Sequence, residues 1–566
     1  MAFKPLPIGV DDFKDLIENG YYYVDKTLMI RDLLKYKGKV KLFTRPRRFG
    51  KTLNMSMLKY FFEDTGNAAE NAVSRKLFAG TKIMEAGEEY TARMSASPVI
   101  MITLKSMKQA GFQQAFLMAK RELAQEYYRH RNIVSSLVSA EEQKRYQNML
   151  DAVGGIDEYL DSLRFLSDCL YRHYGKKVII LIDEYDVPLE NAYYQGFYDD
   201  AVGFIRSIFE SALKTNPGLD FAVVTGCLRI SKESIFTGLN NLEIVSILNA
   251  YYAEYFGFLE AEVEEMLAFY GREAFLGEAR KWYDGYRFGD TEVYNPWSVI
   301  KYVKQVYRNP EAFPEPFWSN TSSNSIVRDL IEHADMAGRD VIETLIQGGT
   351  IEIPIHEDVT YGDVYKNADN LWNFLFFTGY LKVINKRKED IQTIAELAIP
   401  NLEIRYIYEN AIIYWFEDRI KGKSFKPLHQ ALEQGDETAI SNLISDELFE
   451  TISYYDGSSE GFYHGFMTGL LRGIADYSVE SNREAGNGRP DVILRYKRIR
   501  GAAIVLEFKV AKTADEIGSK LGEAETQMIS RNYMKALKGE GYQNVFGYAM
   551  VFYRKECVVR LVKEMA

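Results

Sequence analysis

The chain reads Val178-Ile179-Ile180-Leu181-Ile182-Asp183-Glu184 at the point that decides the fold of its N-terminal half. Five apolar residues in a row are typical of a strand buried on both faces, as in a parallel sheet covered by helices. Two carboxylates follow directly. The first part of the chain alternates such apolar strands with amphipathic helices, which predicts an α/β domain with this acidic pair at a strand end.

A second stretch lies upstream, where a predicted strand, Val40–Thr44, leads into Gly50-Lys51-Thr52. This ending resembles that of a Walker A motif, in which backbone N–H groups and a helix N-terminus hold phosphate. Lys51 would reach the β- and γ-phosphates of ATP, and Thr52 would hold Mg²⁺. We therefore expect a nucleotide site.

Three arginines precede this glycine, in Arg45-Pro46-Arg47-Arg48. Arg45 stands where the Walker consensus has its first glycine, which leaves the shape of the loop open. We expect the arginines to wrap a triphosphate and add charge, with Arg48 and Gly50 among the nucleotide-binding residues. The alternative is a basic turn between a strand and a helix.

The acidic pair completes this first constellation. Asp183-Glu184 at a strand end resembles a Walker B motif, so Asp183 would bind Mg²⁺ through water and Glu184 would polarise the attacking water. Another predicted strand, Pro98–Leu104, falls between the two motifs along the chain, a pattern of the additional-strand AAA-like ATPases. A solvated turn is the alternative for the pair, and the presence of both motifs in order disfavours it.

The next predicted strand, Phe221–Thr225, ends in a residue that would contact the γ-phosphate through water, Thr225. Arg229 and Lys232 follow it. Either is a candidate for an arginine-finger-type or sensing cation. The alternative is a pair of surface charges.

Two short apolar segments near the C-terminus carry charges at their ends, Gly488 to Leu494 and Ala503 to Lys509. A charge in a buried strand is costly unless it has a role there. The polar segment between them predicts a hairpin, which would bring Asp491 near Glu507, while Glu507 and Lys509 share one face. Two carboxylates and a lysine at one sheet edge suit a Mg²⁺-assisted attack of water on a phosphodiester.

Pro490-Asp491 with Glu507-Phe508-Lys509 resembles the PD-(D/E)XK nuclease signature. The resemblance implies that Asp491 and Glu507 bind Mg²⁺ or Mn²⁺ and that Lys509 orients or activates water. It also implies an acidic residue on a preceding helix, for which Glu460, just before the predicted helix Phe462–Ile474, is the closest match. A salt bridge at the strand ends is the alternative.

Further acidic and polar residues belong to this second constellation. Glu484 is another acidic candidate, and Gln527 and Arg531 share a helix face with Tyr533 beyond. The nuclease fold similarly carries a polar helix after its lysine strand. An ordinary solvated helix is the alternative.

The wider resemblance covers most of the chain. Its motifs are Tyr22 to Thr27, Arg45 to Thr52, Ile182 to Asp186, Trp282 to Tyr286 and Tyr294 to Trp297. Together they resemble one bacterial family that joins a predicted AAA-ATPase-like domain to a C-terminal PD-(D/E)XK nuclease-like domain. This implies an α/β fold with a P-loop additional-strand ATPase domain over 1–305, a helical or winged-helix-like middle over 306–450 and an α/β nuclease-like domain over 451–566.

Composition limits the partners. The formal net charge is −11, so any contact with nucleic acid must be a local basic patch, such as Arg45–Arg48 or Arg495–Arg500. Three cysteines far apart in the chain favour a reduced cytoplasm and argue against disulfides and zinc. No signal peptide and no apolar run of about 18 residues is found, so no membrane span is expected.

These features favour an ATP-dependent or ATP-gated nuclease that acts on nucleic acid, with DNA preferred. The alternative from another class is an ATP-dependent regulatory switch or scaffold whose nuclease-like domain binds but does not cut nucleic acid. A signalling ATPase that recognises another protein is a third reading. AAA-like sites often use an arginine from a neighbouring copy, so a homo-oligomer is reasonable.

Overall fold

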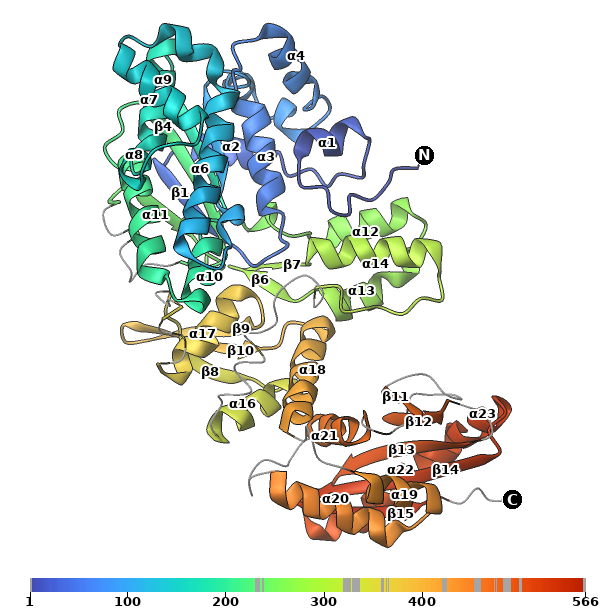
Figure 1. Ribbon diagram of the computed structural model, residues 1–566. Coiled ribbons are helices and arrows are strands. Elements are labelled where there is room, and N and C mark those ends of the chain that lie inside the picture. Colours follow the sequence, from blue (N-terminus) through green and yellow to red (C-terminus); the bar gives the residue numbers. More distant parts are fainter. Residues whose placement is uncertain are drawn as a thin grey trace. The chain divides into compact units, whose positions relative to one another are not determined.

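The computed structural model separates into two compact units (Figure 1). Unit 1 comprises Met1–Ser322 and Glu352–Glu403, and unit 2 comprises Ser323–Ile351 and Ile404–Ala566. The structure describes residues 3–229, 235–236, 239–318, 327, 336–357, 361–362, 364, 366–419, 425–451, 460–472, 474, 476–481, 490–497 and 501–562.

A five-stranded parallel sheet forms the centre of unit 1. Its strands are β1 (Val40–Thr44), β2 (Val99–Thr103), β3 (Val178–Asp183), β4 (Leu219–Gly226) and β5 (Leu242–Val245), in the order β2-β3-β4-β1-β5. Every residue of β1 and β3 is buried, which accounts for their apolar runs. This sheet confirms the α/β fold predicted for the N-terminal half.

The additional strand is not the one that chain order points to. β4 lies between β1 and β3, whereas β2, which falls within the predicted Pro98–Leu104, lies at the edge beside β3. The carboxyl end of β4 therefore lies between the two Walker-like segments. This order places Thr225, near the end of β4, beside both of them.

Helices surround this sheet and extend beyond it (Figure 1). They are α1 (Phe13–Glu18), α2 (Leu28–Lys35), α3 (Lys51–Phe62), α4 (Ala68–Lys76), α5 (Glu88–Thr91), α6 (Phe112–Arg129), α7 (Ala140–Leu150), α8 (Ile156–Tyr159), α9 (Ser162–Tyr174), α10 (Val187–Gln195), α11 (Tyr198–Leu213), α12 (Glu260–Phe269), α13 (Leu276–Tyr283) and α14 (Pro296–Arg308). A short hairpin, β6 (Tyr286–Phe288) and β7 (Thr291–Val293), connects α13 to α14.

The last part of unit 1 is a small element that we call the winged element, residues 352–398. It contains most of β8 (Ile351–Pro354), then α17 (Ala368–Thr378), β9 (Lys382–Glu389) and β10 (Gln392–Ala398), with the strand order β8-β10-β9. The name refers to the described strand, helix and antiparallel hairpin, which follow one another in this order.

Unit 2 is built on a mixed sheet of five strands. They are β11 (Tyr477–Ser481), β12 (Val492–Tyr496), β13 (Ala502–Val510), β14 (Asn544–Tyr553) and β15 (Glu556–Leu561), paired in chain order. All pairs are antiparallel except β13–β14, which α22 (Ile517–Ser530) and α23 (Tyr533–Gly539) connect. Residues of these two helices, including Met528 and Leu537, form a core with Ile493 and Val505 of the sheet.

The remaining helices are α16 (Met336–Ile346), α18 (Leu402–Arg419), α19 (Lys426–Gln434), α20 (Glu437–Thr451) and α21 (Glu460–Arg472). Gly435, which adopts φ +76°, caps the end of α19. Among the described residues, no helix has both the length and the apolar character needed to cross a membrane.

A buried carboxyl group at the start of α18 makes the stability of the fold depend on pH. Glu403 is fully buried and accepts hydrogen bonds from Ser298 Oγ at 2.9 Å and from the backbone N–H of Trp318 at 2.8 Å. Burial raises the pKa of Glu403 to about 8. The folded state therefore favours the neutral acid, whereas the unfolded chain ionises near the ordinary pKa of a glutamate.

The contribution of Glu403 to stability is complete below its ordinary pKa and is lost as pH rises toward 8. The free energy of unfolding of the wild type should fall by at most about 1.4 kcal/mol for each pH unit because of Glu403. Glu403→Gln stays neutral, so we expect this fall to be absent from the variant. Urea unfolding between pH 5 and 8 measures this slope. Glu292→Gln, at an exposed position of β7, is the control. Equal slopes for the wild type and Glu403→Gln would contradict the assignment.

Candidate functional sites

The loop between β1 and α3 has the backbone of a phosphate-binding turn. Arg48 and Gly50 have φ of +70° and +80°, so the chain reverses sharply before α3 begins at Lys51. Lys51 is buried, and its Nζ donates to the carbonyl oxygens of Arg45 and Pro46 at 2.8 Å each. The lysine thus lies inside the curve of the loop, where a phosphate would be bound.

Two predicted hydroxyl residues, Thr52 of α3 and Thr225 of β4, meet at the predicted carboxylate of β3, Asp183. Thr52 Oγ1 donates to Asp183 Oδ2 at 2.7 Å, and Thr225 Oγ1 donates to Asp183 Oδ1. Asp183 is 1% exposed, so these hydroxyl groups compensate for the burial of its charge. The hydroxyl and carboxylate oxygens are ligands of the kind that Mg²⁺ prefers, so these residues fit a nucleotide-bound Mg²⁺.

Glu184 occupies a strained position next to this carboxylate. Its φ of +53° lies in the left-handed region, which is uncommon for a residue with a side chain and often marks a functional site. Burial raises the pKa of Glu184, the Asp183 charge raises it further, and Lys51 opposes both effects. A carboxylate with a raised pKa is a better general base near neutral pH.

Arg45 does not line the phosphate loop, contrary to the prediction. The side chain is fully buried, with its Cζ 5.1 Å from the ring centre of Phe256 and 4.9 Å from that of Phe288. Its Nη1 donates to the carbonyl oxygens of Thr44 and Val245 at 2.9 Å. Burial lowers the pKa of Arg45 to about 9. Arg45 therefore anchors the base of the loop.

The side chains of the other two arginines, Arg47 and Arg48, lie nearer the protein surface than that of Arg45, as expected of residues that would bind a nucleotide. Arg47 forms an ion pair with Glu190 of α10. Arg48 lies over the ring of Trp297, with its Cζ 4.5 Å from the ring centre. A cation over the face of an aromatic ring is attracted to it, so this contact holds Arg48 beside the loop.

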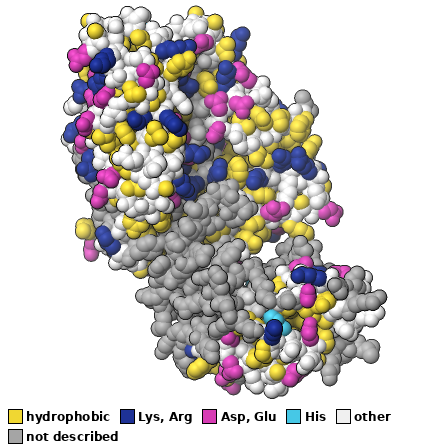
Figure 2. Space-filling view, viewed as in Figure 1, with side chains coloured by type: hydrophobic (Ala, Val, Ile, Leu, Met, Phe, Trp, Pro, Cys, Tyr) yellow, Lys and Arg dark blue, Asp and Glu magenta, His cyan; other side chains and the backbone are white. Residues whose placement is uncertain are grey.

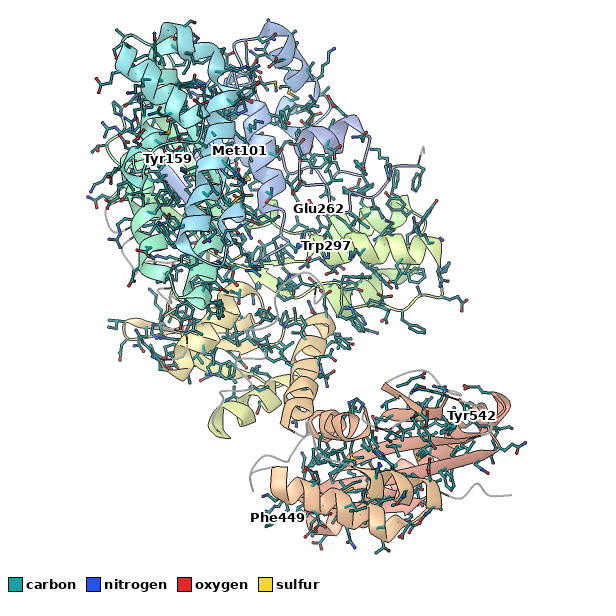
Figure 3. All side chains as sticks on the ribbon, viewed as in Figure 1. Met101, Tyr159, Glu262, Trp297, Phe449 and Tyr542 are labelled. Carbon is teal, nitrogen blue, oxygen red and sulfur yellow. The ribbon has the colours of Figure 1, made fainter. Side chains whose placement is uncertain are left out.

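Several motifs of the wider resemblance have no chemical role that follows from their residues. In the structure they hold the loop and its domain together. Trp297 lies in the first turn of α14 and supports Arg48, while Phe49 packs against Tyr286 and Phe288 of the hairpin. Lys26 pairs with Glu262 of α12 at 2.6 Å (Trp297 and Glu262 are labelled in Figure 3). These motifs therefore contribute to packing around the loop.

Asp186 is a site residue that the sequence argument overlooked. Its Oδ2 accepts the backbone N–H groups of Cys227 and Leu228 at 2.7 and 3.1 Å. It thereby fixes the turn that leaves β4 and carries Arg229. The signal was present as an acidic residue three positions after Asp183, within Asp183-Glu184-Tyr185-Asp186.

The structure places the two candidate cations as follows. Arg229 Nη1 lies 3.2 Å from Glu357 Oε2 of the winged element. Lys232 lies outside the described residues.

The second site lies where β12 begins and β13 ends, and the predicted hairpin pairing is confirmed. Val492 pairs with Leu506, so the register brings Asp491 opposite Glu507. Asp491 Oδ2 accepts the backbone N–H of Phe508 at 2.7 Å, and Lys509 Nζ lies 3.3 Å from Glu507 Oε1. Glu507 is 1% exposed. All three predicted residues are therefore together at one sheet edge.

Helix α21 borders this edge. His464 Nε2 lies 2.9 Å from the carbonyl oxygen of Asp491, and the His464 ring packs against Phe508. Glu460 is the first residue of α21, but its side chain lies outside the described residues, as does all of Glu484. Among the described residues, no three His, Cys, Asp or Glu side chains form a metal-binding group.

A polar face of α22 lies on the other side. Gln527 and Arg531 line a pocket of about 520 Å³. Burial raises the pKa of Tyr533, and so do the charges of Glu507 and Asp491, whereas a hydrogen bond from Gln527 and the Arg531 charge lower it. These polar groups are therefore close enough to influence the carboxylate pair.

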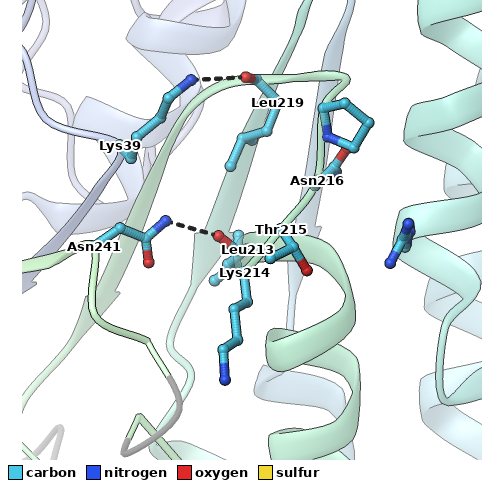
Figure 4. Close-up of a pocket in the computed structure, with 9 residues that line it drawn as sticks. Lys39, Leu213, Lys214, Thr215, Asn216, Leu219 and Asn241 are labelled. Atoms are coloured by element: carbon cyan, nitrogen blue, oxygen red, sulfur yellow. Dashed lines mark hydrogen bonds between the residues drawn. The ribbon is translucent and has the colours of Figure 1, made fainter.

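Another pocket, of about 550 Å³, is found at the opposite edge of the unit 1 sheet (Figure 4). Lys39, Leu219 and Asn241 line it, and these residues precede or begin β1, β4 and β5. Lys51 and Asp183 lie at the carboxyl ends of the strands. This pocket is therefore separate from the nucleotide site.

Two family models match separate parts of the chain. Residues 7–236 match the family described as Predicted AAA-ATPase, and residues 458–561 match the PD-(D/E)XK nuclease superfamily. A protein of Azotobacter chroococcum mcd 1, described as an uncharacterized protein in the vnfD 5' region, is 24% identical over 554 residues, which cover 96% of this chain and 95% of that relative. The chain thus joins an AAA-ATPase-like domain to a C-terminal PD-(D/E)XK nuclease-like domain.

The buried position of Arg45 can be tested by comparing two substitutions. Arg45→Ala should destabilise the fold by about 2–5 kcal/mol because it leaves a cavity between the two phenylalanines. Arg45→Met fills most of that volume and buries no charge, so its cost should be much smaller. Denaturant unfolding measures both. Arg47→Ala, which removes a partly exposed ion pair, should cost about 1 kcal/mol or less.

Nucleotide binding gives a second readout for the same variants. Arg45→Met should leave ATP affinity close to that of the wild type. A large loss of ATP affinity with little loss of stability would indicate that Arg45 contacts the bound nucleotide.

Proposed function

We propose that unit 1 binds and hydrolyses ATP with Mg²⁺. The observation that carries this proposal is the meeting of Thr52 and Thr225 on the Asp183 carboxylate, directly beside Lys51 at the start of α3. The matched family of residues 7–236 supports the same reading.

The residues divide the reaction between them. Lys51 would exchange its loop carbonyls for the β- and γ-phosphates, and the N-terminus of α3 would add its own N–H groups. Thr52 and Asp183 would hold the Mg²⁺ that accompanies ATP, which neutralises phosphate charge. Glu184 would accept the proton of the attacking water, and Thr225 would contact the γ-phosphate through water.

Substitutions of Lys51 and Glu184 separate binding from hydrolysis. Glu184→Gln should lower the turnover of ATP about 100-fold or more while preserving affinity, because only the base is lost. Lys51→Ala should lose affinity itself. A fluorescent ATP analogue and a phosphate-release assay measure the two properties, with Lys39→Ala at the other sheet edge as the control.

The rate of hydrolysis should also fall as pH drops through the raised pKa of Glu184, since the base must be deprotonated. Unchanged affinity and turnover in Lys51→Ala would argue against the ATPase proposal.

We also propose that the site of unit 2 is a metal-dependent nuclease. The alignment of Asp491 and Glu507 across one β-pair, with Lys509 on the face of Glu507, supports it. Mg²⁺ is commonly held by one or two carboxylates and several waters, so this pair fits it, with Mn²⁺ as a substitute. Asp491 and Glu507 would hold the ion, with Glu460 as a candidate third ligand.

Each residue of the site would have a distinct part in hydrolysis. The bound metal would supply an activated water near neutral pH. Lys509 would orient that water and stabilise the charge that develops on the phosphate. His464 contacts the backbone oxygen of Asp491, so it would position this residue rather than touch the substrate.

The substrate in this proposal is nucleic acid, with DNA preferred, and the setting is a reduced cytoplasm. On the face shown in Figure 2, acidic and basic side chains of unit 1 are interspersed rather than gathered into one basic field. With a net charge of −11, the protein would therefore hold nucleic acid by local contacts. Assembly into a homo-oligomer would allow an arginine from a neighbouring copy to complete the ATP site.

Cleavage assays with supercoiled DNA, linear DNA and RNA, each with Mg²⁺ or Mn²⁺ and with or without ATP, test this proposal. Glu507→Gln or Lys509→Ala should slow cleavage about 100-fold or more. Glu525→Gln, which removes a surface ion pair with Arg560 in the same unit, should not slow cleavage. If no substrate is cut under any condition, a regulatory switch or scaffold that only binds nucleic acid becomes the better description.

A further inference from the structure

The winged element lies against the phosphate loop. Gly379, which ends α17 with φ +94°, is so close to the loop that an added Cβ would lie 2.9 Å from Pro46 Cβ. Tyr361 is fully buried against Tyr193 and lies near the ion pair of Arg47 and Glu190. Both contacts belong to unit 1. The loop therefore cannot change shape without affecting the winged element.

One carboxylate of the winged element reaches the carboxyl edge of the sheet itself. Glu357 Oε2 contacts Arg229 Nη1 at 3.2 Å, and Glu357 Oε1 accepts a hydrogen bond from Ser246 Oγ at 3.0 Å. Arg229 follows β4, and Ser246 directly follows β5. Because β4 and β5 flank β1, Glu357 bridges residues on both sides of the strand that carries the phosphate loop.

Arg229 is itself directed to this edge. Asp186 fixes the two residues before it, and Cys227 Sγ lies 3.6 Å from Lys51 Nζ. Arg229 is two residues beyond Cys227, so the segment that carries it passes beside the lysine expected to hold the β- and γ-phosphates. The contact of Arg229 with Glu357 shows that its guanidinium binds an anion in this structure.

The ion pair is of a kind that exchanges easily. The side chains of Arg229 and Glu357 are 32% and 29% exposed, and partly exposed ion pairs contribute little stability. A triphosphate carries several negative charges, against one on the carboxylate, and its oxygens suit the fork of a guanidinium. ATP can therefore compete for Arg229. ADP lacks the γ-phosphate, the group that would reach Arg229.

We propose that Arg229 is the residue that distinguishes ATP from ADP, and that Glu357 takes the place of the γ-phosphate when none is bound. ATP would draw Arg229 away from Glu357 and so loosen the winged element, whereas ADP would leave the pair intact. This inference rests on the proposed binding of ATP. It adds that Arg229 contacts the γ-phosphate and that this contact replaces the ion pair with Glu357.

The linkage between the two contacts gives the test. A ligand that must displace Glu357 binds more tightly when Glu357 is neutral. Glu357→Gln should therefore raise affinity for a non-hydrolysable ATP analogue about 5-fold or more and leave ADP affinity unchanged. Glu352→Gln is the matched control, because Glu352 pairs with Arg387 within the same element.

Variants of Arg229, the ion-pair partner of Glu357, provide a second test that remains valid if one variant fails to fold. Arg229→Gln should bring the affinities for the ATP analogue and ADP close together, and Arg229→Lys should retain part of the difference. Thermal unfolding checks that each variant is folded. As a second readout, hydrogen exchange of α17 and the β9–β10 hairpin should rise with the ATP analogue but not with ADP.

The outcomes distinguish this inference from the proposal beneath it. If Glu357→Gln changes the affinities for both nucleotides equally, or changes neither, while Lys51→Ala abolishes binding, Arg229 does not sense the γ-phosphate and the inference is overturned. If the wild-type protein binds neither nucleotide, the proposed ATP site itself is wrong.

Discussion

The N-terminal site depends on one buried carboxylate shared by two hydroxyl groups. Asp183, at the end of β3, accepts hydrogen bonds from Thr52 of α3 and Thr225 of β4. An ionised group 1% exposed would be costly without such partners, so the strand order β3-β4-β1 is enforced by polar as well as apolar contacts. A strand placed elsewhere in the sheet would leave this charge without one of its donors.

The architecture of the chain was predictable where local pattern decides it. Apolar runs identify β1 and β3 because both faces of a parallel strand are buried, and the charged ends of β12 and β13 locate the second site. Long-range partners were not predictable. Arg45 looks like a phosphate ligand in sequence, and only the approach of Phe256 and Phe288, more than 200 positions away, shows that it is buried.

The same reason explains the other differences. Chain order placed Pro98–Leu104 between the Walker-like motifs, yet spatial order depends on crossover connections that local sequence does not specify. The pairing of Glu357 with Arg229 joins residues 128 positions apart. Asp186 lies close to Asp183 in sequence, but the two backbone N–H groups that it accepts belong to residues 41 and 42 positions away, which local sequence does not specify.

The hydrogen bond from the Phe508 backbone N–H to Asp491 has a consequence for how genetic losses at the second site are interpreted. The carboxylate that would hold the metal also closes the β12–β13 pair at its open end. Loss of Asp491 would therefore combine a local unravelling of the sheet with a missing ligand, and an inactive protein could arise from either. Lys509 Nζ lies 3.3 Å from Glu507 Oε1 on the same strand, and its replacement leaves the hydrogen bond between Asp491 and Phe508 in place, so it separates chemistry from architecture more cleanly.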